Sequence, residues 1–299
     1  MRGIGAALAM AIAGAAAAET LVVRETQYNT IYIERTGTYV SMLFGRNQNL
    51  YTESVANTAD PLELPAEYTR YMSLSLAYVP EPRTLLEIGL GGATTSSYLQ
   101  NTFPDLDITI VELDPVVVEL AQEYFFLRPD DGLRVVVRDG RIFLVRSPDT
   151  YDVILIDAFR APFVPFHLQT QEFFQLVEDH LAEGGVMAEN VETTTTLFEP
   201  VLATIQSVFD HVDLYHSDRS NVVVVAYNGP ERAPADLAAA AASIDARFAP
   251  RYPLTGLLAA RDTIGPVDAQ VMTDDFAPVE LFTAVERNNA DPAVRPLAP

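Results

Sequence analysis

Apolar residues in the middle of the chain fall into two alternating patterns. Short unbroken apolar runs are typical of parallel strands buried on both faces, whereas apolar residues spaced by three or four are typical of helices. The strand pattern occurs near residues 84–88, 108–112, 133–137, 152–157, 184–189 and 221–227, and the helix pattern near 93–101, 115–125, 170–182 and 197–208. This alternation predicts an α/β fold with a parallel sheet covered by helices on both faces. We expect the last two strands to close the sheet through an antiparallel edge.

The segments on either side of this core have different patterns. β-rich runs at 21–23, 30–33 and 38–43 are separated by turn-forming residues, which predicts a small antiparallel unit. Residues 65–78 have helical spacing, and an Ala-rich stretch at 233–248 predicts a further helix before irregular pieces begin. The sequence predicts four parts: a separate N-terminal segment at 1–18, a small β domain at 19–64, the α/β domain at 65–230, and a helical and irregular extension at 231–299.

The first eighteen residues have a composition of their own. A single charge at Arg2 precedes a run rich in Ala, Ile and Met, which ends in Ala16-Ala17-Ala18 before Glu19. A basic start, a short apolar core and small residues at a cleavage position predict a secretory signal peptide. We therefore expect an exported or periplasmic protein. An uncleaved membrane anchor is one alternative, and a cytoplasmic location follows if the segment is not a signal.

A glycine turn follows the first core strand. The apolar run 84–88 leads into Gly89, Gly91 and Gly92, and the next strand ends about twenty residues later at Glu112. Glycines let the backbone approach a ligand closely, and an acid after the second strand accepts hydrogen bonds from ribose hydroxyls. The pattern predicts nucleoside binding. The alternative is a tight turn between strand and helix that binds nothing.

The surrounding residues narrow the kind of nucleotide. Thr94 departs from the dinucleotide fingerprint, and the chain has no lysine for a phosphate-binding loop or for Schiff-base chemistry. The pattern therefore favours the Rossmann-like fold of S-adenosylmethionine-dependent methyltransferases. Asp139-Gly140 follows the third strand, where the acid could accept from an adenine amino group. Asp157 ends the fourth strand and is expected at the pocket mouth.

Composition excludes several classes of function. A net charge of −22 disfavours nucleic-acid binding and suits a cationic substrate, although an acidic surface without a partner explains it as well. The absence of cysteine excludes disulfides, thiol nucleophiles and thiolate metal sites. The four histidines are scattered without ligand spacing, so no metal site is predicted.

The order of these parts resembles the spermidine synthase (polyamine aminopropyltransferase) family, in particular its divergent bacterial spermidine synthase-like branch. The resemblance covers roughly residues 24–228, with a weaker echo at 273–278. The residues that carry it are Gln27–Ile31 in an opening strand, Leu43–Gln48 in a turn, Glu67-Tyr68, Glu112, Asp139-Gly140, Asp157, Pro165–Leu168 and Thr170–Phe174.

This resemblance implies transfer of an aminopropyl group from decarboxylated S-adenosylmethionine to a small amine acceptor, without a metal. It implies that Asp157 is the general base and that Tyr28 and Tyr68 line the substrate site. The donor site implied by the resemblance consists of Gln48, Gly89, Gly91, Gly92, Glu112, Asp139 and Gly140. Members of the family are often dimers or tetramers, which allows a homodimer here.

Three positions depart from the family pattern. Gly92 stands where the family has an aspartate that holds the amine of the donor, and Arg70 and Arg160 replace two further acids. If both arginines point inward, they repel a diamine and favour a carboxylate or phosphate group. Two alternatives therefore stay open: an S-adenosylmethionine-dependent methyltransferase, and a non-catalytic relative that binds a nucleoside or another ligand.

Overall fold

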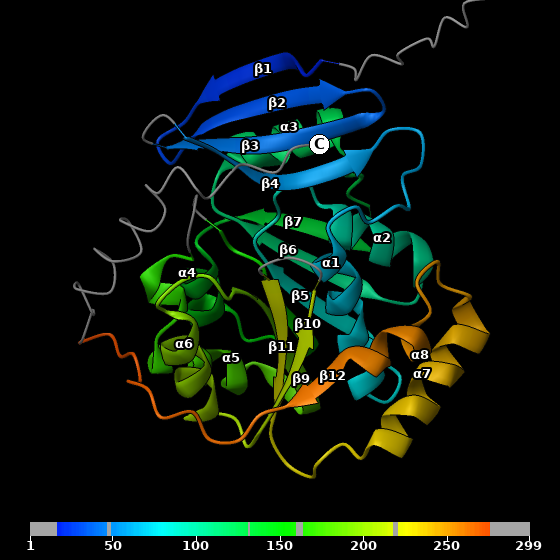
Figure 1. Cartoon of the computed structure of the whole chain (residues 1–299), viewed down its shortest axis with the longest axis vertical. Coiled ribbons are helices and arrows are strands. Elements are labelled where there is room, and N and C mark those ends of the chain that lie inside the picture. Colours follow the sequence, from blue (N-terminus) through cyan, green and yellow to red (C-terminus); the bar gives the residue numbers. More distant parts are fainter. Residues whose placement is uncertain (1–16, 47–48, 131, 160–163, 218–220, 276–299) are drawn as a thin grey trace, which may run out of the picture.

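A mixed sheet of eight strands forms the centre of the described structure (Figure 1). The computed structural model describes residues 17–46, 49–130, 132–159, 164–217 and 221–275. The strands of this sheet are β5 (Thr84–Ile88), β6 (Asp107–Glu112), β7 (Leu133–Val137), β8 (Tyr151–Ile156), β9 (Leu181–Glu192), β10 (His211–His216), β11 (Asn221–Tyr227) and β12 (Arg261–Thr263).

The order of the strands is β12-β10-β11-β9-β8-β5-β6-β7. The five strands from β9 to β7 are parallel, whereas β11, β10 and β12 each pair antiparallel with their neighbours. The α/β fold and its antiparallel edge are therefore as predicted. The chain order reverses between β5 and β8, which is where ligands bind in open α/β sheets.

Helices cover both faces of the sheet (Figure 1). One face packs against α1 (Glu67–Met72), the 3₁₀ segment η1 (Ser73–Tyr78), α2 (Thr94–Thr102), α3 (Pro115–Tyr124), α7 (Pro234–Phe248) and α8 (Leu254–Leu257). The other packs against α4 (Gly140–Arg146), α5 (Gln171–Asp179) and α6 (Phe198–Gln206). Two shorter 3₁₀ segments are η2 (Phe166–Leu168) and η3 (Leu258–Ala260). In the described part of the chain, no helix is long and apolar enough to cross a membrane.

A second, antiparallel sheet lies above the carboxyl ends of the central strands (Figure 1). It consists of β1 (Glu19–Glu25), β2 (Thr30–Thr36), β3 (Tyr39–Arg46) and β4 (Asn49–Asn57), paired in that order. Its inward side chains, among them Ile31, Ile33 and Met42, belong to the same apolar cluster as Leu74 and Tyr98. The two sheets therefore share one core, and the small sheet is held firmly over the larger one.

Several elements differ from the sequence-based expectation. Residues 65–78 form α1 and then a 3₁₀ segment instead of one helix, and α5 ends before β9 begins at Leu181. Strand β10 was not predicted because a charged residue, Asp213, interrupts its apolar pattern. In the fold this carboxylate is buried, and it accepts from the Tyr78 hydroxyl at 2.7 Å and pairs with the Arg261 guanidinium at 2.8 Å. Burial is tolerated because both partners compensate the charge.

Three predictions concern residues outside the described ranges. These are residues 1–16 of the predicted signal peptide, Gln48 in the predicted nucleoside site, and Arg160 in the predicted substrate site. Export of the protein therefore stays a prediction from the sequence.

Candidate active site

A cavity opens at the carboxyl ends of β5, β6, β7 and β8, at the point where the strand order reverses, and β4 of the small sheet borders it. Its wall is unusually acidic. The lining carboxylates are those of Glu53, Glu87, Glu112, Asp114, Asp139 and Asp157. The predicted site residues that line this cavity are Tyr28, Tyr68, Gly89, Gly91, Glu112, Asp139, Gly140 and Asp157.

The glycine turn after β5 is packed too closely for side chains. Gly89 has φ +100°, and a Cβ there would lie 2.2 Å from the carbonyl oxygen of Asp157. A Cβ on Gly91 would lie 2.5 Å from Oγ of Ser54, a residue of β4. Glycine is required at Gly89 and Gly91 because only it leaves this space and tolerates the positive φ. The small sheet therefore closes directly onto the turn.

Gly92 does not line the cavity. Its N–H donates to Oγ of Ser54 at 2.8 Å, and a Cβ at this position would lie 2.5 Å from Cδ1 of Phe125. The Phe125 ring fully occupies the space beside the turn and is itself buried. Phe125 and Ser54 therefore leave no room for an acidic side chain at Gly92.

Glu112, at the end of β6, is held by the backbone of the two neighbouring turns. Its Oε1 accepts from the N–H of Asp114 at 2.8 Å, and its Oε2 accepts from the N–H of Leu90 at 3.1 Å. Burial raises the pKa of Glu112 to about 7, while these backbone donors oppose the rise. The carboxylate is therefore fixed with its remaining lone pairs toward the cavity, as a ribose-binding acid requires.

Asp139 precedes α4 and caps it. Its Oδ1 accepts from the N–H of Ile142 at 2.9 Å, and its Oδ2 lies 2.8 Å from Nε2 of His167. The hydrogen bond with His167 lowers the pKa of Asp139. A Cβ on Gly140 would lie 2.4 Å from Cγ2 of Ile88, so glycine allows α4 to pack closely on β5.

Asp157, just after β8, is the most elaborately held acid of the site. Tyr68 donates its hydroxyl to Oδ2 at 3.1 Å, and Asn190 donates Nδ2 to Oδ1 at 2.9 Å. Asn221 in turn donates to Oδ1 of Asn190 at 2.9 Å, which fixes the orientation of that amide. Burial raises the pKa of Asp157 to about 6, while the two hydrogen bonds favour its charged form. Asp157 is therefore an ionised, oriented base near neutral pH.

Two cavity acids, Glu53 and Glu87, were not identified from the sequence. Glu87 is only 2% exposed, and its Oε2 has no hydrogen-bond partner among the described residues. Burial raises its pKa, and the charge of Asp157 raises it further. An acid inside the apolar run of β5 was an available signal for Glu87. Glu53 lies in β4, whose sequence has no apolar periodicity, and only the fold brings it to the cavity.

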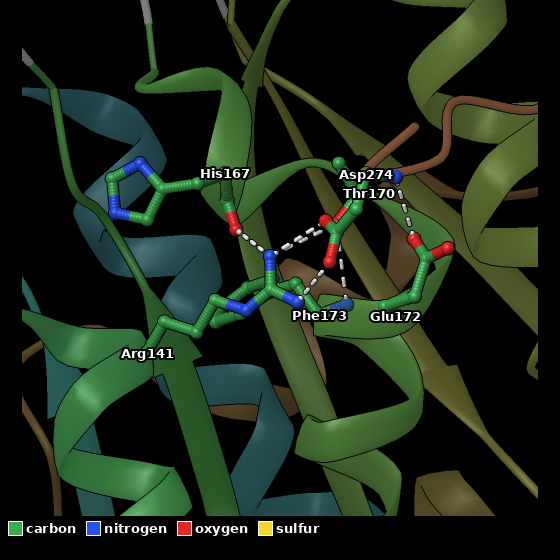
Figure 2. A network of polar contacts seen from close by, with 6 residues as sticks. All are labelled: Arg141, His167, Thr170, Glu172, Phe173 and Asp274. Atoms are coloured by element: carbon green, nitrogen blue, oxygen red, sulfur yellow. Dashed lines mark hydrogen bonds and ion pairs between the residues drawn. The ribbon is translucent and has the colours of Figure 1, made fainter. Parts of the chain in front are cut away.

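A polar network fixes the rim of the cavity beside Asp139 (Figure 2). Arg141 of α4 donates through Nη1 and Nη2 to the carboxylate of Asp274, at 2.7 and 2.5 Å, and through Nη1 to the carbonyl of His167 at 3.2 Å. The Thr170 hydroxyl donates to Asp274 at 2.8 Å, and the N–H of Asp274 donates to Glu172 at 2.9 Å. The C-terminal segment thus ties α4 to the start of α5.

Arg70 lies away from the cavity, contrary to an inward orientation. Its Nε and Nη2 donate to the carbonyl of Leu64, at 2.9 and 2.8 Å, and its guanidinium stacks on the ring of Tyr252. Arg70 therefore cannot repel a cation in the site from this position. Among the described residues, no group of three His, Asp or Glu side chains is arranged to hold a metal ion.

Residues 72–218 match the family model described as spermine/spermidine synthase domain. Over these residues, the chain is similar to this family. A polyamine aminopropyltransferase of Vibrio vulnificus is 37% identical to the chain over 145 residues, which are 48% of this chain and 48% of that protein. The chain thus spans about half of the length of this relative.

Solved structures resemble the chain over a longer stretch than the synthase domain alone. A probable spermidine synthase from Corynebacterium glutamicum superimposes with a TM-score of 0.65 at 19% identity, over 86% of this chain and 97% of that one. Human methyltransferase-like protein 13 in complex with SAH gives a TM-score of 0.56 at 25% identity, over 70% and 99%. These structures share the methyltransferase-like fold that carries the synthase domain.

Proposed function

We propose that this protein transfers an aminopropyl group from decarboxylated S-adenosylmethionine to a small amine acceptor. The observation that carries the proposal is the oriented carboxylate of Asp157, held by Tyr68 and Asn190 at the mouth of an acid-lined cavity. A cavity of this charge suits substrates that bear ammonium and sulfonium groups. The spermine/spermidine synthase domain and the aminopropyltransferase relative support the same reaction.

The nucleoside end of the donor would bind at the glycine turn. Glu112 has lone pairs left for the ribose hydroxyls, and the close packing at Gly89 and Gly91 leaves the turn open to the ligand. Asp139 would accept from the adenine amino group, in exchange for or beside its contact with His167. No phosphate is present in this donor, which agrees with a turn that carries no lysine.

The transfer step forms one C–N bond and breaks one C–S bond. The acceptor nitrogen attacks the aminopropyl carbon attached to sulfur, and the electrons of the C–S bond leave on sulfur, so that neutral methylthioadenosine departs. The nitrogen loses a proton to Asp157, because a protonated amine has no lone pair for attack. An acid with a pKa of about 6 is mostly ionised at neutral pH and can accept this proton. Positioning supplies most of the remaining catalysis.

Methyl transfer from S-adenosylmethionine is the second candidate. It is favoured by the likeness to human methyltransferase-like protein 13 and by the missing acid at Gly92. The contacts of Arg70 with Leu64 and Tyr252 remove one reason to expect a carboxylate-bearing ligand. The acidic cavity therefore favours aminopropyl transfer over methyl transfer.

Calorimetric titration of the full chain tests the proposal. We expect binding of decarboxylated S-adenosylmethionine and methylthioadenosine, weaker binding of S-adenosylmethionine, and formation of methylthioadenosine when a diamine is added. The Asp157→Asn variant should bind both nucleosides and form no product. Preference for S-adenosylmethionine would instead support the methyltransferase, and no binding of any of the three would exclude both enzymes.

A further inference from the structure

We propose that Glu53, on the small N-terminal sheet, selects ligands with a protonated amine beside the nucleoside. In the donor of the proposed function this amine is the aminopropyl ammonium, so the assignment rests on that function. Glu53 would thus give the site its preference for ligands that bear an ammonium group.

Glu53 lies beside the glycine turn. Glu53 precedes Ser54 in β4, and Ser54 is the residue whose Oγ accepts from the N–H of Gly92. The backbone oxygen of Glu53 lies 3.9 Å from the position that a Cβ on Gly91 would occupy. Its side chain lines the cavity and is partly accessible from within it. A nucleoside at the glycine turn would therefore extend its sulfur-linked chain along this acid.

The side chain of Glu53 is surrounded by other acids. The carboxylates of Asp157 and Glu192 act on Glu53, and Glu53 in turn acts on the Tyr68 hydroxyl together with Asp157 and Glu87. Glu87 lies in the same cavity wall, buried and with an oxygen that has no partner among the described residues. An unpartnered buried carboxylate is costly unless a ligand supplies the missing donor. An ammonium group has three donors and one positive charge, which fits this surrounding.

Among the described residues, the basic side chains that line the cavity do not supply the missing donor. Arg138 and His167 line the cavity, but both are next to Asp139, at the adenine end. Asp157 already accepts from Tyr68 and Asn190. The two acids therefore have different roles. Asp157 accepts a proton from the acceptor amine, and Glu53 binds the ammonium group of the donor.

This division has a consequence for protons. Burial and the neighbouring carboxylates raise the pKa of Glu53 to about 8, so the empty site holds a proton there at neutral pH. A bound ammonium favours the ionised carboxylate and lowers this pKa. Near pH 7, binding of a ligand with an aliphatic ammonium should therefore release more protons than binding of a nucleoside without one, which leaves Glu53 protonated.

The experiment compares two probes on the full chain by calorimetry. Methylthioadenosine has no amine, whereas decarboxylated S-adenosylhomocysteine has an aminopropyl ammonium, and sulfur is neutral in both. The variants are Glu53→Gln, which keeps the shape and removes the charge, and Glu53→Asp, which keeps the charge on a shorter side chain. Glu25→Gln is the matched control, because Glu25 is an exposed acid of the same sheet. Titrations in two buffers of different ionisation enthalpy count the protons released.

We expect wild type and Glu25→Gln to prefer the amine probe by roughly ten- to a hundredfold, the range of a charge-assisted hydrogen bond. Glu53→Gln should reduce this preference to within about threefold and abolish most of the proton release, with unchanged affinity for methylthioadenosine. Glu53→Asp should lie between the two, which also shows that the position tolerates substitution.

Undiminished preference and proton release in Glu53→Gln would overturn the assignment and leave the proposed function intact. No binding of methylthioadenosine by wild type would overturn the proposed function itself, and the role of Glu53 with it.

Discussion

The network around Asp274 predicts that this residue stabilises both the fold and the nucleoside site. We consider Asp274→Asn, which keeps the size of the side chain and removes its charge. Asp274 accepts two hydrogen bonds from Arg141 and one from Thr170 (Figure 2). The amide oxygen of Asn can replace only one of the two carboxylate oxygens, and the NH₂ group in the place of the other oxygen faces the guanidinium as a second donor. The variant therefore leaves Arg141 partly unpaired.

The magnitude follows from geometry and exposure. Hydrogen bonds to charged groups contribute about 1.5–3 kcal/mol when buried, whereas exposed ion pairs contribute about 0–1 kcal/mol. The side chains of Arg141 and Asp274 are 21% and 41% exposed, and their contact is bidentate. We therefore expect a loss of about 1–2 kcal/mol of unfolding free energy, or roughly 2–3 °C in Tm for a chain of this size.

Part of this loss should appear in binding. Arg141 follows Asp139 by two residues and donates to the carbonyl of His167, so it holds both groups that meet the adenine end. If about 1 kcal/mol of the loss falls on the bound state, methylthioadenosine binds roughly fivefold more weakly. Thermal unfolding and calorimetry of the same preparations measure the two effects.

Asp275→Asn is the matched control, since it removes the same charge one residue away from these contacts. An Arg141→Met, Asp274→Asn double-mutant cycle isolates the pair energy. The reasoning is refuted if Asp274→Asn and Asp275→Asn have the same Tm and the same affinity, or if the cycle shows no coupling.

Three further predictions concern single side chains. Tyr68→Phe removes a donor to ionised Asp157, so the pKa of Asp157 should rise from about 6 by roughly one unit, measured by NMR titration. Glu189 is fully buried with a raised pKa, so it keeps its proton when folded and loses it when unfolded. The contribution of Glu189 to stability should therefore fall as the pH rises above ~4.5, by up to about 1.4 kcal/mol per pH unit, so Glu189→Gln should be more stable relative to wild type at pH 8 than at pH 5. Gly92→Ala should lose about 1–3 kcal/mol of unfolding free energy by overpacking Phe125, and Phe125→Leu in the same chain should restore part of the loss in chemical denaturation.

Each of these has an outcome that contradicts it. An unchanged or lowered pKa of Asp157 would show that Tyr68 does not stabilise the charged form. An equal effect of Glu189→Gln at both pH values would show that Glu189 is ionised in the fold. Wild-type stability of Gly92→Ala would show that the Phe125 ring moves aside without cost.

The α/β core could be predicted because local patterns and the buried sheet demand the same residues. Between their end residues, the apolar runs of β5 to β8 have polar side chains only at Glu87, Thr109, Arg134 and Asp152, and helices with one apolar face lie between the strands. Once the strands are parallel, their carboxyl ends share one edge. The meeting of the glycine turn with Glu112 and Asp157 at one cavity follows from this topology.

Side-chain contacts between distant segments could not be predicted in the same way. Arg70 follows Tyr68 by two residues, yet Tyr68 reaches Asp157 while Arg70 turns to Leu64 and Tyr252. Helical geometry places residues two apart on different faces, but the local sequence does not tell which of these faces meets the cavity. The contacts of Arg70 depend on where the C-terminal helices place Tyr252.

The sequence by itself thus determined the alternation of strands and helices in the core, the glycine turn after β5, and the positions of Glu112 and Asp157 at strand ends, since each is visible in local periodicity or in short spacing along the chain. Only the tertiary structure decided the character of the cavity wall. Glu53 comes from a strand without apolar pattern, and Asp274 lies more than a hundred residues from the Arg141 and Thr170 that it joins. Their roles arise from packing one sheet over another and one terminus against a helix, and long-range packing leaves no periodic trace in the residues that it brings together.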